Sequence, residues 1–408
     1  MLHLNRASSI PCRAALSAPH RLLFLGGALA LLLTMAWWGV ELGAGVFGID
    51  LPQPTLPPAW AHAMLAQYGM LPPFMLGFLL TVFPRWLGRP PTRVRQYLPI
   101  FALQFGGYLL AVAGLLGMPR VLLGGFVLML AALLLALGVL GKMLVAAGTR
   151  VQHAVSCYLA LMLGALGEAA FVAHLLGAPW WWAMLAIQLG TFGFLLPMFV
   201  SVCHRMIPFF SASVVPGYRM LRPRWSLPLL WILLLGHLVL SLAHGFAWLW
   251  VVDAPLTLVL AWHAWAWQPW LALRPGLLTV LHVAFAWLPL SFLLFTLQSA
   301  VLAVTGVFVL ARAPLHALAI GFFGSMLVAM VTRVTQGHSG RPLRMGGVAW
   351  FGFATLQVVA ATRIIAALGV DRELWLLLSA GGWLLAFAPW VARLAWVLLT
   401  PRAHGAEG

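Results

Sequence analysis

The sequence has very little charge and few acidic residues. Of its 408 residues, 7% are Asp, Glu, Lys or Arg, 63% are hydrophobic, and only seven are acidic. The polar stretches between apolar runs reach about 15–20 residues at most, too short for a soluble domain with its own core. This composition predicts a single transmembrane domain over residues 1–408, with short tails outside about 20–400.

Cysteine is scarce as well. The three cysteines are Cys12, Cys157 and Cys203, and none has a second cysteine close by in the sequence. This spacing gives no support to a disulfide framework and contains no CxxC metal site. A phosphate-binding loop and a nucleophile elbow are also absent from the sequence, so it carries no signature of a soluble enzyme.

Long apolar runs, by contrast, are abundant. Runs of about 20 residues, the length that crosses a hydrocarbon core of ~30 Å, recur about twelve times. They predict an all-α polytopic membrane protein with about twelve transmembrane helices. The expected spans are residues 22–47, 60–84, 97–117, 120–141, 153–177, 180–204, 226–249, 254–272, 277–310, 313–332, 346–368 and 373–399. The first is longer than the hydrophobic part of a signal peptide, so we expect a retained anchor.

The basic residues predict how these spans are threaded. With the N-terminus in the cytoplasm, 19 of the 23 Lys and Arg residues fall on the inner side. The four exceptions are Arg120, Arg312, Arg363 and Arg372. Five of the seven acidic residues are expected in outer loops, and these are Glu41, Asp50, Asp253, Asp371 and Glu373. The positive-inside rule therefore predicts a multi-pass protein with both termini cytoplasmic.

The net charge of +16 has the same origin. The basic residues are spread over many short loops and do not form one patch or one helix face. We interpret them as topology signals that also contact anionic lipid headgroups. Membrane lipid is thus an expected partner, and nucleic acid is not.

Histidine is unusually frequent, with 13 residues. An ionisable ring inside a bilayer costs free energy and is a functional candidate, because imidazole binds haem iron and copper. Such a ring can equally form a hydrogen bond between helices. The topology places His62, His174, His244 and His316 at an outer level, His153, His204, His282 and His338 toward the cytoplasm, and His237 and His263 nearer the middle. Two layers would suit two cofactor or metal sites.

Four segments carry a family resemblance. They are residues 59–91 (AWAHAMLAQYGMLPPFMLGFLLTVFPRWLGRPP), 204–211 (HRMIPFFS), 280–290 (VLHVAFAWLPL) and 316–343 (HALAIGFFGSMLVAMVTRVTQGHSGRPL). In this order and on twelve spans, they resemble the NnrS family of haem- and copper-containing membrane proteins. That family is associated with bacterial denitrification and resistance to nitric oxide. The resemblance covers about residues 20–400, and its last segment is the most specific.

The resemblance singles out particular residues. Carried over one by one, it marks His62, the Arg205–Pro208 turn, His282, His316, Arg333, His338, Arg341 and Pro342. The chain also departs from the family. The usual His-x-His-Glu-Met motif has Trp60 for its first His and Ala63 for its Glu, which removes one possible ligand and the carboxylate. Cys203 and His204 replace residues that are commonly small.

The helix number and the outer-level histidines on helices 2 and 10 also look like subunit I of haem–copper oxidases and nitric oxide reductases. In those proteins a His pair from these two helices holds a low-spin haem. The adjacent His pair expected on helix 7 is absent here, because His237 and His244 are seven residues apart. A second His close after His316 is absent too. These absences in the sequence argue against turnover at a dinuclear centre.

The resemblance implies a haem- and copper-binding protein of the bacterial inner membrane that serves the response to nitric oxide. His62 and His316 would be axial ligands of a haem b, since no CxxCH attachment motif exists. His244, His282 and His338 would be further haem or copper ligands, and His237 and His263 are additional metal-ligand candidates. Arg333 and Arg341, with His338, would hold a haem propionate.

Two other functions stay open at this point. One is a transporter or cofactor-handling permease for a metal, a haem or a small molecule, with histidines along its path. The other is an oxidoreductase that metabolises nitric oxide. Nitric oxide and a redox partner protein are the expected partners beyond lipid, and whether the protein is an enzyme stays open.

Overall fold

The computed structural model describes residues 13–51, 55–148, 151–369 and 372–403. Within these ranges every regular element is a helix. The prediction of an all-α polytopic membrane protein is confirmed. Arg6, Cys12, Arg150 and Asp371, which entered the charge and cysteine arguments, lie outside the described residues.

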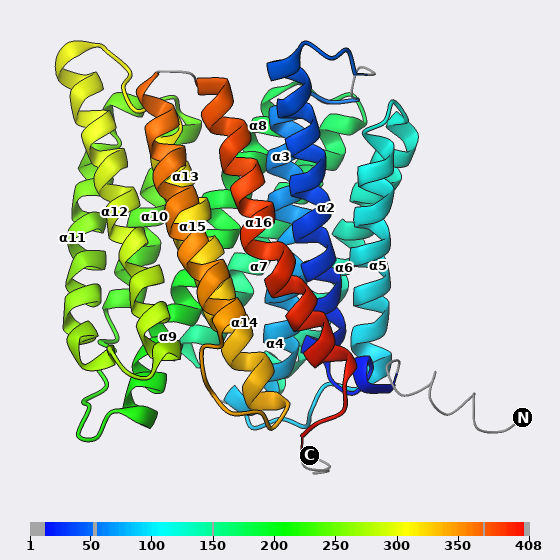
Figure 1. Cartoon of the computed structure of the whole chain (residues 1–408), viewed down its shortest axis with the longest axis vertical. Helices are drawn as coiled ribbons and strands as arrows, with labels where there is room; N and C mark the ends of the chain where they lie inside the picture. The colour runs from blue at the N-terminus through cyan, green and yellow to red at the C-terminus, as the bar shows by residue number, and fades with distance from the viewer. Residues whose placement is uncertain (1–12, 52–54, 149–150, 370–371, 404–408) are drawn as a thin grey trace, which may run out of the picture.

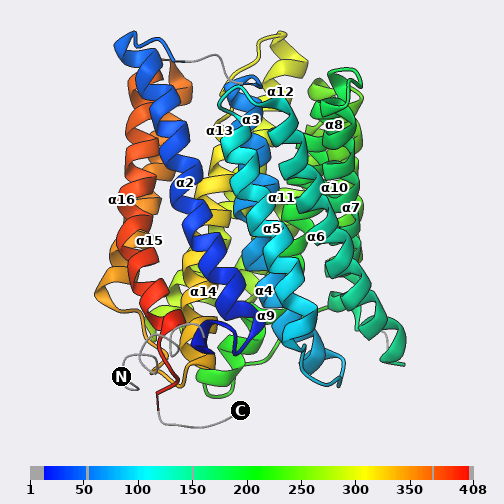
Figure 2. The same cartoon turned by 90° about the vertical axis from the view of Figure 1, so that its right-hand side faces the viewer.

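Ten helices in the described ranges are long and apolar enough to cross a membrane. Seven of them are single α-helices, and three are composite. The single helices are α2 (Pro19–Phe47), α5 (Val94–Gly114), α6 (Pro119–Ala146), α7 (Gln152–Leu175), α12 (Gly276–Thr305), α15 (Gly347–Ile365) and α16 (Arg372–Leu399). Figures 1 and 2 show them as one upright bundle.

The remaining two predicted spans correspond to shorter helices. These are α10 (Ser226–Leu242) and α11 (Trp250–Ala266), with 17 residues each. At a rise of about 1.5 Å per residue, each is about 25 Å long, short of a hydrocarbon core of ~30 Å. His244 and Gln268 have positive φ angles of 55° and 53°, and the chain turns there. The count of twelve and the relationship to the oxidases therefore stay predictions.

Three acidic residues predicted for outer loops lie in helices instead. Glu41 lies in α2, and Glu373 lies in the first turn of α16. Asp253 lies in the first turn of α11 and is fully buried. The reason is that α11 begins at Trp250, ahead of the predicted span, and turns this carboxylate toward a histidine on α10.

The three composite spans form the centre of the bundle. Each has an α-helix, a π-helical segment and a second α-helix. They are α3 (Pro58–Met64), η1 (Leu65–Met70) and α4 (Pro72–Trp86); α8 (Trp181–Gln188), η2 (Leu189–Leu195) and α9 (Leu196–Val214); and α13 (Ala313–His316), η5 (Ala317–Gly324) and α14 (Ser325–His338). Their apolar windows are 72–89% buried, against 33–56% in the other spans. Such π segments are frequent at functional sites.

Close packing at the π segments depends on glycine. A Cβ atom on Gly69 would lie 2.5 Å from the Tyr108 ring, and one on Gly321 would lie 2.4 Å from Trp287. Both distances are too short for any real contact, so only glycine lets these large side chains reach the π-helical backbone. The widened turn also leaves carbonyls for side chains, and the Gln104 amide donates to the Tyr68 carbonyl at 2.7 Å.

The first and last spans close the bundle. The guanidinium of Arg21, in the first turn of α2, donates to the carbonyls of Val397 and Leu398 at the end of α16. Helix α2 therefore begins where α16 ends, as Figures 1 and 2 show. We call this the inner end, because the charge bias predicts that it faces the cytoplasm, and we call the opposite end the outer end.

Candidate functional site

His62 and His316 line one cavity near the outer end, which we call the outer pocket. His62 comes from α3 and His316 from the last position of α13. Helices α2, α15 and α16 complete the walls with Trp38, Arg363 and Trp383. The cavity volume is about 160 Å³. The structure thus brings together the two histidines that the sequence predicted on the second and tenth spans.

The tautomer of His316 follows from its two hydrogen bonds. Its Nδ1 lies 2.9 Å from the carbonyl oxygen of Arg312, which can only accept. Its Nε2 lies 3.2 Å from Nη2 of Arg363, which can only donate. The ring is therefore neutral, with its proton on Nδ1 and its lone pair on Nε2, directed toward the pocket side where Arg363 lies.

His62 is held by stacking and has an unused ring nitrogen. Its ring stacks on Trp38, with centroids 4.6 Å apart and an interplanar angle of 16°. Its Nδ1 is buried and has no hydrogen-bond partner among the described residues. The same is true of Gln67 Oε1 and Trp383 Nε1, which belong to other residues of this pocket. Buried polar atoms are normally paired, so these three indicate room for a ligand or water.

The outer pocket is positively charged. Arg312 and Arg363 line it, and its other lining residues within the described ranges are uncharged or histidine. Sequence analysis did not assign either arginine to the site, although both break the charge bias of the loops. Their predicted position on the outer side was the signal that could have identified them. The positive-inside rule does not explain a cation there, so such a residue is a candidate for a functional role.

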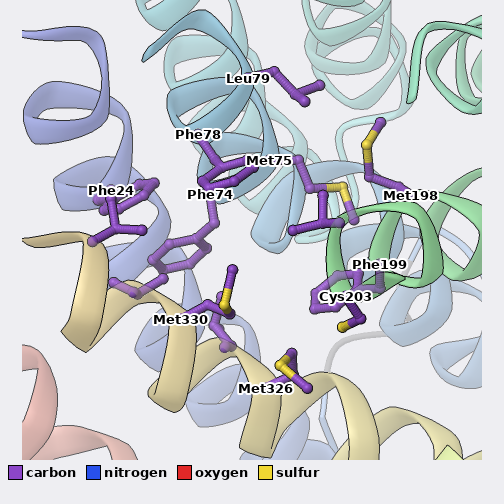
Figure 3. A pocket seen from close by; sticks show the side chains of 14 residues that line it. Phe24, Phe74, Met75, Phe78, Leu79, Met198, Phe199, Cys203, Met326 and Met330 are labelled. Carbon is purple, nitrogen blue, oxygen red and sulfur yellow. The ribbon is translucent and has the colours of Figure 1, made fainter. Parts of the chain in front are cut away.

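A second cavity lies directly inward of the outer pocket. The same three central spans line both, and the chain passes from Leu71, Leu195 and Gly324 in one to Phe74, Met198 and Met326 in the other. Figure 3 shows side chains from α2, α4, α9 and α14 around this smaller space of about 60 Å³. Its walls are aromatic, aliphatic and sulfur-containing. This apolar layer separates the outer pocket from the inner end.

Three histidines gather near the inner end, in what we call the inner histidine cluster. The Ser226 hydroxyl donates to the Pro223 carbonyl, so His204 Nε2–H donates to Ser226 Oγ at 2.7 Å. His204 Nδ1 then accepts from His153 Nε2 at 2.9 Å. The ring of His263 lies 5.4 Å from that of His204. Sequence analysis gave His153 no role, because no motif surrounds it.

His237 pairs with the buried carboxylate of Asp253. Its Nδ1 lies 2.7 Å from Asp253 Oδ1, and both side chains are almost fully buried. Phe192 packs on the imidazole, with ring centroids 4.1 Å apart. His237 also lines a cavity that shares Arg312 with the outer pocket. The structure thus places His237 next to the outer pocket and His263 in the inner histidine cluster, not in a middle layer.

The other predicted ligands lie apart from the outer pocket. His244 is exposed in the turn after α10, so the seven-residue spacing from His237 does not place the two rings on one helical face. His282, on α12, lies near Ser211, with Nε2 3.4 Å from Oγ. His338 ends α14, and its ring lies 4.7 Å from that of His20.

The two predicted anion-binding arginines are separated as well. Arg333 is buried, with its guanidinium 3.9 Å above the Phe210 ring. Arg341 lies in the loop after α14 and donates to Thr400 Oγ1 at 2.8 Å. Among the described residues, no three His, Cys, Asp or Glu side chains are arranged so that they could hold a metal ion.

A comparison with protein families matches residues 14–402 to the family described as NnrS protein. No curated protein sequence matches the chain. Since the family match covers nearly the whole chain, the protein belongs to the NnrS family of nitric oxide-associated membrane proteins.

Proposed function

We propose that this protein binds a b-type haem in the outer pocket, between His62 and His316, and that this haem serves the response to nitric oxide. The observation that carries the proposal is that the two histidines, 254 positions apart in sequence, line the same cavity. A neutral imidazole is a common axial ligand of haem iron. We further propose the bacterial inner membrane as its location, with both termini in the cytoplasm.

The donor set of the pocket fits this cofactor. His316 has its lone pair on Nε2, because Nδ1 is committed to the Arg312 carbonyl. A backbone acceptor of this kind orients a ligating ring and raises its basicity. His62 has a free ring nitrogen and a ring orientation fixed by Trp38. Both side chains can therefore face an iron without losing a hydrogen bond to the backbone.

The charge of the pocket fits as well. A haem carries two propionates, and Arg312 and Arg363, which both line the pocket, are cations that can bind them. In this structure Arg363 donates to the same His316 nitrogen that an iron would take. We infer that Arg363 moves from His316 to a propionate when haem binds, and that the walls open, since a porphyrin needs more than the space now present. Charge-assisted hydrogen bonds favour this exchange.

A bound haem would supply one-electron chemistry if both His62 and His316 held it, or a binding position for nitric oxide if only one of them did. The chain's own residues orient the two rings, neutralise the propionates and keep the site apolar on its inner side. Copper stays a prediction drawn from the family, and no step is assigned to it. A redox partner protein likewise stays a prediction.

Substitution of the two histidines tests the proposal. We expect His62→Ala and His316→Ala each to lower haem content or to convert a low-spin spectrum to a five-coordinate one, because each removes one axial ligand. The measurement is the visible spectrum and the pyridine haemochrome of detergent-purified protein. His174→Ala is the matched control, since this outer-level histidine bonds only the Ala178 carbonyl and does not line the outer pocket.

Two results would contradict the proposal. Full haem content and an unchanged spectrum in both variants would place the ligands elsewhere. Colour that stays with the polypeptide after extraction into acidified acetone would exclude haem b, because the chain has no motif for covalent attachment.

A further inference from the structure

A separate cavity opens at the inner end, between α14, α15 and α16. Its volume is about 300 Å³. Its lining includes Thr335, Arg341, Arg344 and Arg393. It shares no lining residue with the outer pocket, and it lies at the other end of the bundle. We call it the inner basic cavity.

The inner basic cavity has three cations and, among the described residues, no anion. Arg341, Arg344 and Arg393 line it, and no lining residue is acidic. The guanidinium groups of Arg341 and Arg393 lie 5.1 and 4.4 Å from the centre of the same ring, that of Trp396. Burial, followed by the charge of Arg393, lowers the pKa of Arg341. Two cations on one aromatic ring repel each other, and a bound anion would relieve this repulsion.

Two buried polar atoms at the cavity have no partner. The Thr335 side chain is 4% exposed, and its hydroxyl makes no hydrogen bond within the described residues. Nη1 of Arg341 is also buried without a partner, although Nη2 of the same group is bonded to Thr400. A hydroxyl and a guanidinium N–H can both donate to one oxyanion. Buried donors without partners are not expected on a surface that is only rich in basic residues, so they indicate a specific anion-binding site.

The start of α15 adds further donors. This 19-residue helix begins at Gly347. Its N-cap residue is Gly346, so no side chain caps the first N–H groups of the helix. Gly346, Gly347, Val348 and Ala349 all line the cavity. The first N–H groups of a helix lack partners within the helix and carry partial positive charge, which favours an anion at this position.

The loop that presents Arg341 is pinned in place. The Gln336 side chain accepts from the Arg344 N–H at 3.0 Å and donates to the Arg344 carbonyl at 2.8 Å. The Arg341 N–H donates to the Gln336 carbonyl at 3.1 Å. Because these bonds fix the backbone before any ligand arrives, binding here loses little conformational entropy.

The surroundings of the cavity suit a membrane interface. Trp350 and Trp396 are 39% and 50% exposed, and Leu343 is 46% exposed. Tryptophan is enriched at the headgroup level of membrane proteins. The inner leaflet, which this end is predicted to meet, contains anionic lipids. A phosphate group at this position can therefore belong to a lipid whose chains lie against the apolar bundle.

We propose that the inner basic cavity binds the phosphate of an anionic phospholipid. Arg341 and Thr335 donate to the phosphate oxygens, Arg344 and Arg393 balance the negative charge, and the N-terminus of α15 faces the same group. This site is independent of the haem proposal, and either one can fail alone.

Lipid titration monitored by native mass spectrometry tests the site. Delipidated full-length protein is titrated with phosphatidylglycerol, with phosphatidylcholine and with inorganic phosphate. We expect one phosphatidylglycerol to bind at least tenfold more tightly than phosphatidylcholine. Thr335→Val should weaken it five- to tenfold, because one hydrogen bond to a charged group is lost at constant shape and charge. Arg341→Gln should weaken it more than tenfold.

Arg95→Gln is the matched control. Arg95 is exposed in another basic cavity at the same end, lined also by Arg89, Arg93 and Lys142, and none of these side chains has a buried unpaired atom. Its loss should change the affinity less than twofold. Equal effects of Arg95→Gln and Arg341→Gln would overturn the proposal in favour of general charge attraction. If Arg341→Gln does not fold, an unchanged affinity in Thr335→Val overturns it alone.

The phosphate arm separates the two sources of the anion. Binding of inorganic phosphate that depends on Thr335 and Arg341, without a preference for phosphatidylglycerol, would overturn the lipid as ligand and assign the cavity to a soluble phosphate. Preference for phosphatidylglycerol with the same two dependences supports the proposal as stated.

Discussion

The outer pocket and the inner histidine cluster both hold buried imidazoles, but they bond them differently. In the outer pocket, His62 keeps an unpaired nitrogen, and His316 accepts a hydrogen bond from the guanidinium of Arg363. In the inner histidine cluster, both nitrogens of His204 are bonded to neutral neighbours, and the chain of donors runs in one direction from His153 to Pro223.

This difference separates two uses of one residue type. A histidine whose two ring nitrogens both form hydrogen bonds between helices needs no ligand, and its hydrogen bonds stabilise the fold. A histidine with a free nitrogen at a cavity costs free energy until something binds. Position along a span does not distinguish these cases, whereas an unpaired nitrogen on a ring that also lines a cavity does. This difference supports the proposal that the outer pocket binds a ligand, and it indicates a packing role for His153 and His204.

The outer pocket and the inner histidine cluster are expected to lie toward opposite sides of the membrane. Reporters of periplasmic location fused after Asp50 or Gly177 should be active, and those fused after Arg89 or Arg222 should be inactive. The reason is the 19-to-4 split of Lys and Arg. Activity of a matched cytoplasmic reporter at the same four positions serves as the control. The reverse result at two positions would invert the assignment of inner and outer ends.

Substitution of His204 should affect stability more than any other change in the inner histidine cluster. His204→Ala removes its bonds to His153 and Ser226 and leaves a cavity, so we expect a loss of about 2–3 kcal/mol in the free energy of unfolding. Thermal or denaturant unfolding in detergent measures this loss. Haem content per folded molecule should stay unchanged, and a loss of haem without a loss of stability would show that the inner cluster belongs to the cofactor site.

Arg363→Gln should weaken the outer pocket without abolishing it. The variant loses a cation that we assign to a propionate, worth about 1 kcal/mol, or roughly a fivefold change in haem affinity. Haem titration of the apo protein measures this change. The ligand field of the bound haem should stay the same, since both histidines remain. A fivefold or greater gain in affinity would instead mean that Arg363 only competes with iron for His316.

His263→Phe is the smallest expected effect and the sharpest check on the comparison. His263 Nε2 is buried without a partner among the described residues, although the residue lies in the inner histidine cluster. Phenylalanine removes that unsatisfied atom together with the Nδ1 bond to Val259, so the two effects nearly cancel and unfolding should change by less than about 1 kcal/mol. Loss of a bound metal or of haem in this variant would make His263 a ligand.

The fold class was predictable because length and apolarity alone decide which segments can cross a bilayer. The shortening of α10 and α11 was not, since it depends on turns at His244 and Gln268 in residues that do not favour positive φ angles. The π segments could not be predicted either, because the sequence analysis assumed regular α-helices with 3.6 residues per turn. Each π segment rotates the helix that follows it. Residues on either side of the segment therefore do not share the helix face that a spacing of 3.6 residues per turn predicts.

The site was predictable in part, for a related reason. His62 and His316 were identified because they occur in family motifs, and the structure places them in one pocket. The pairing of His153 with His204 was missed, because the direction of a side chain around a buried helix depends on its neighbours and not on local sequence. Asp253 was predicted to lie in a loop because it is charged. In the structure its contact with His237 offsets the cost of burying the carboxylate.

The closed arrangement of the bundle has a consequence for biogenesis. Trp38 of α2 and Trp383 of α16 both line the outer pocket, so its walls include two helices that are far apart in the sequence. A nascent chain that ends before residue 372 contains both histidines but lacks the part of the wall that α16 provides. A cofactor bound in this pocket, as we propose, would therefore be fully enclosed only after α16 has packed against α2.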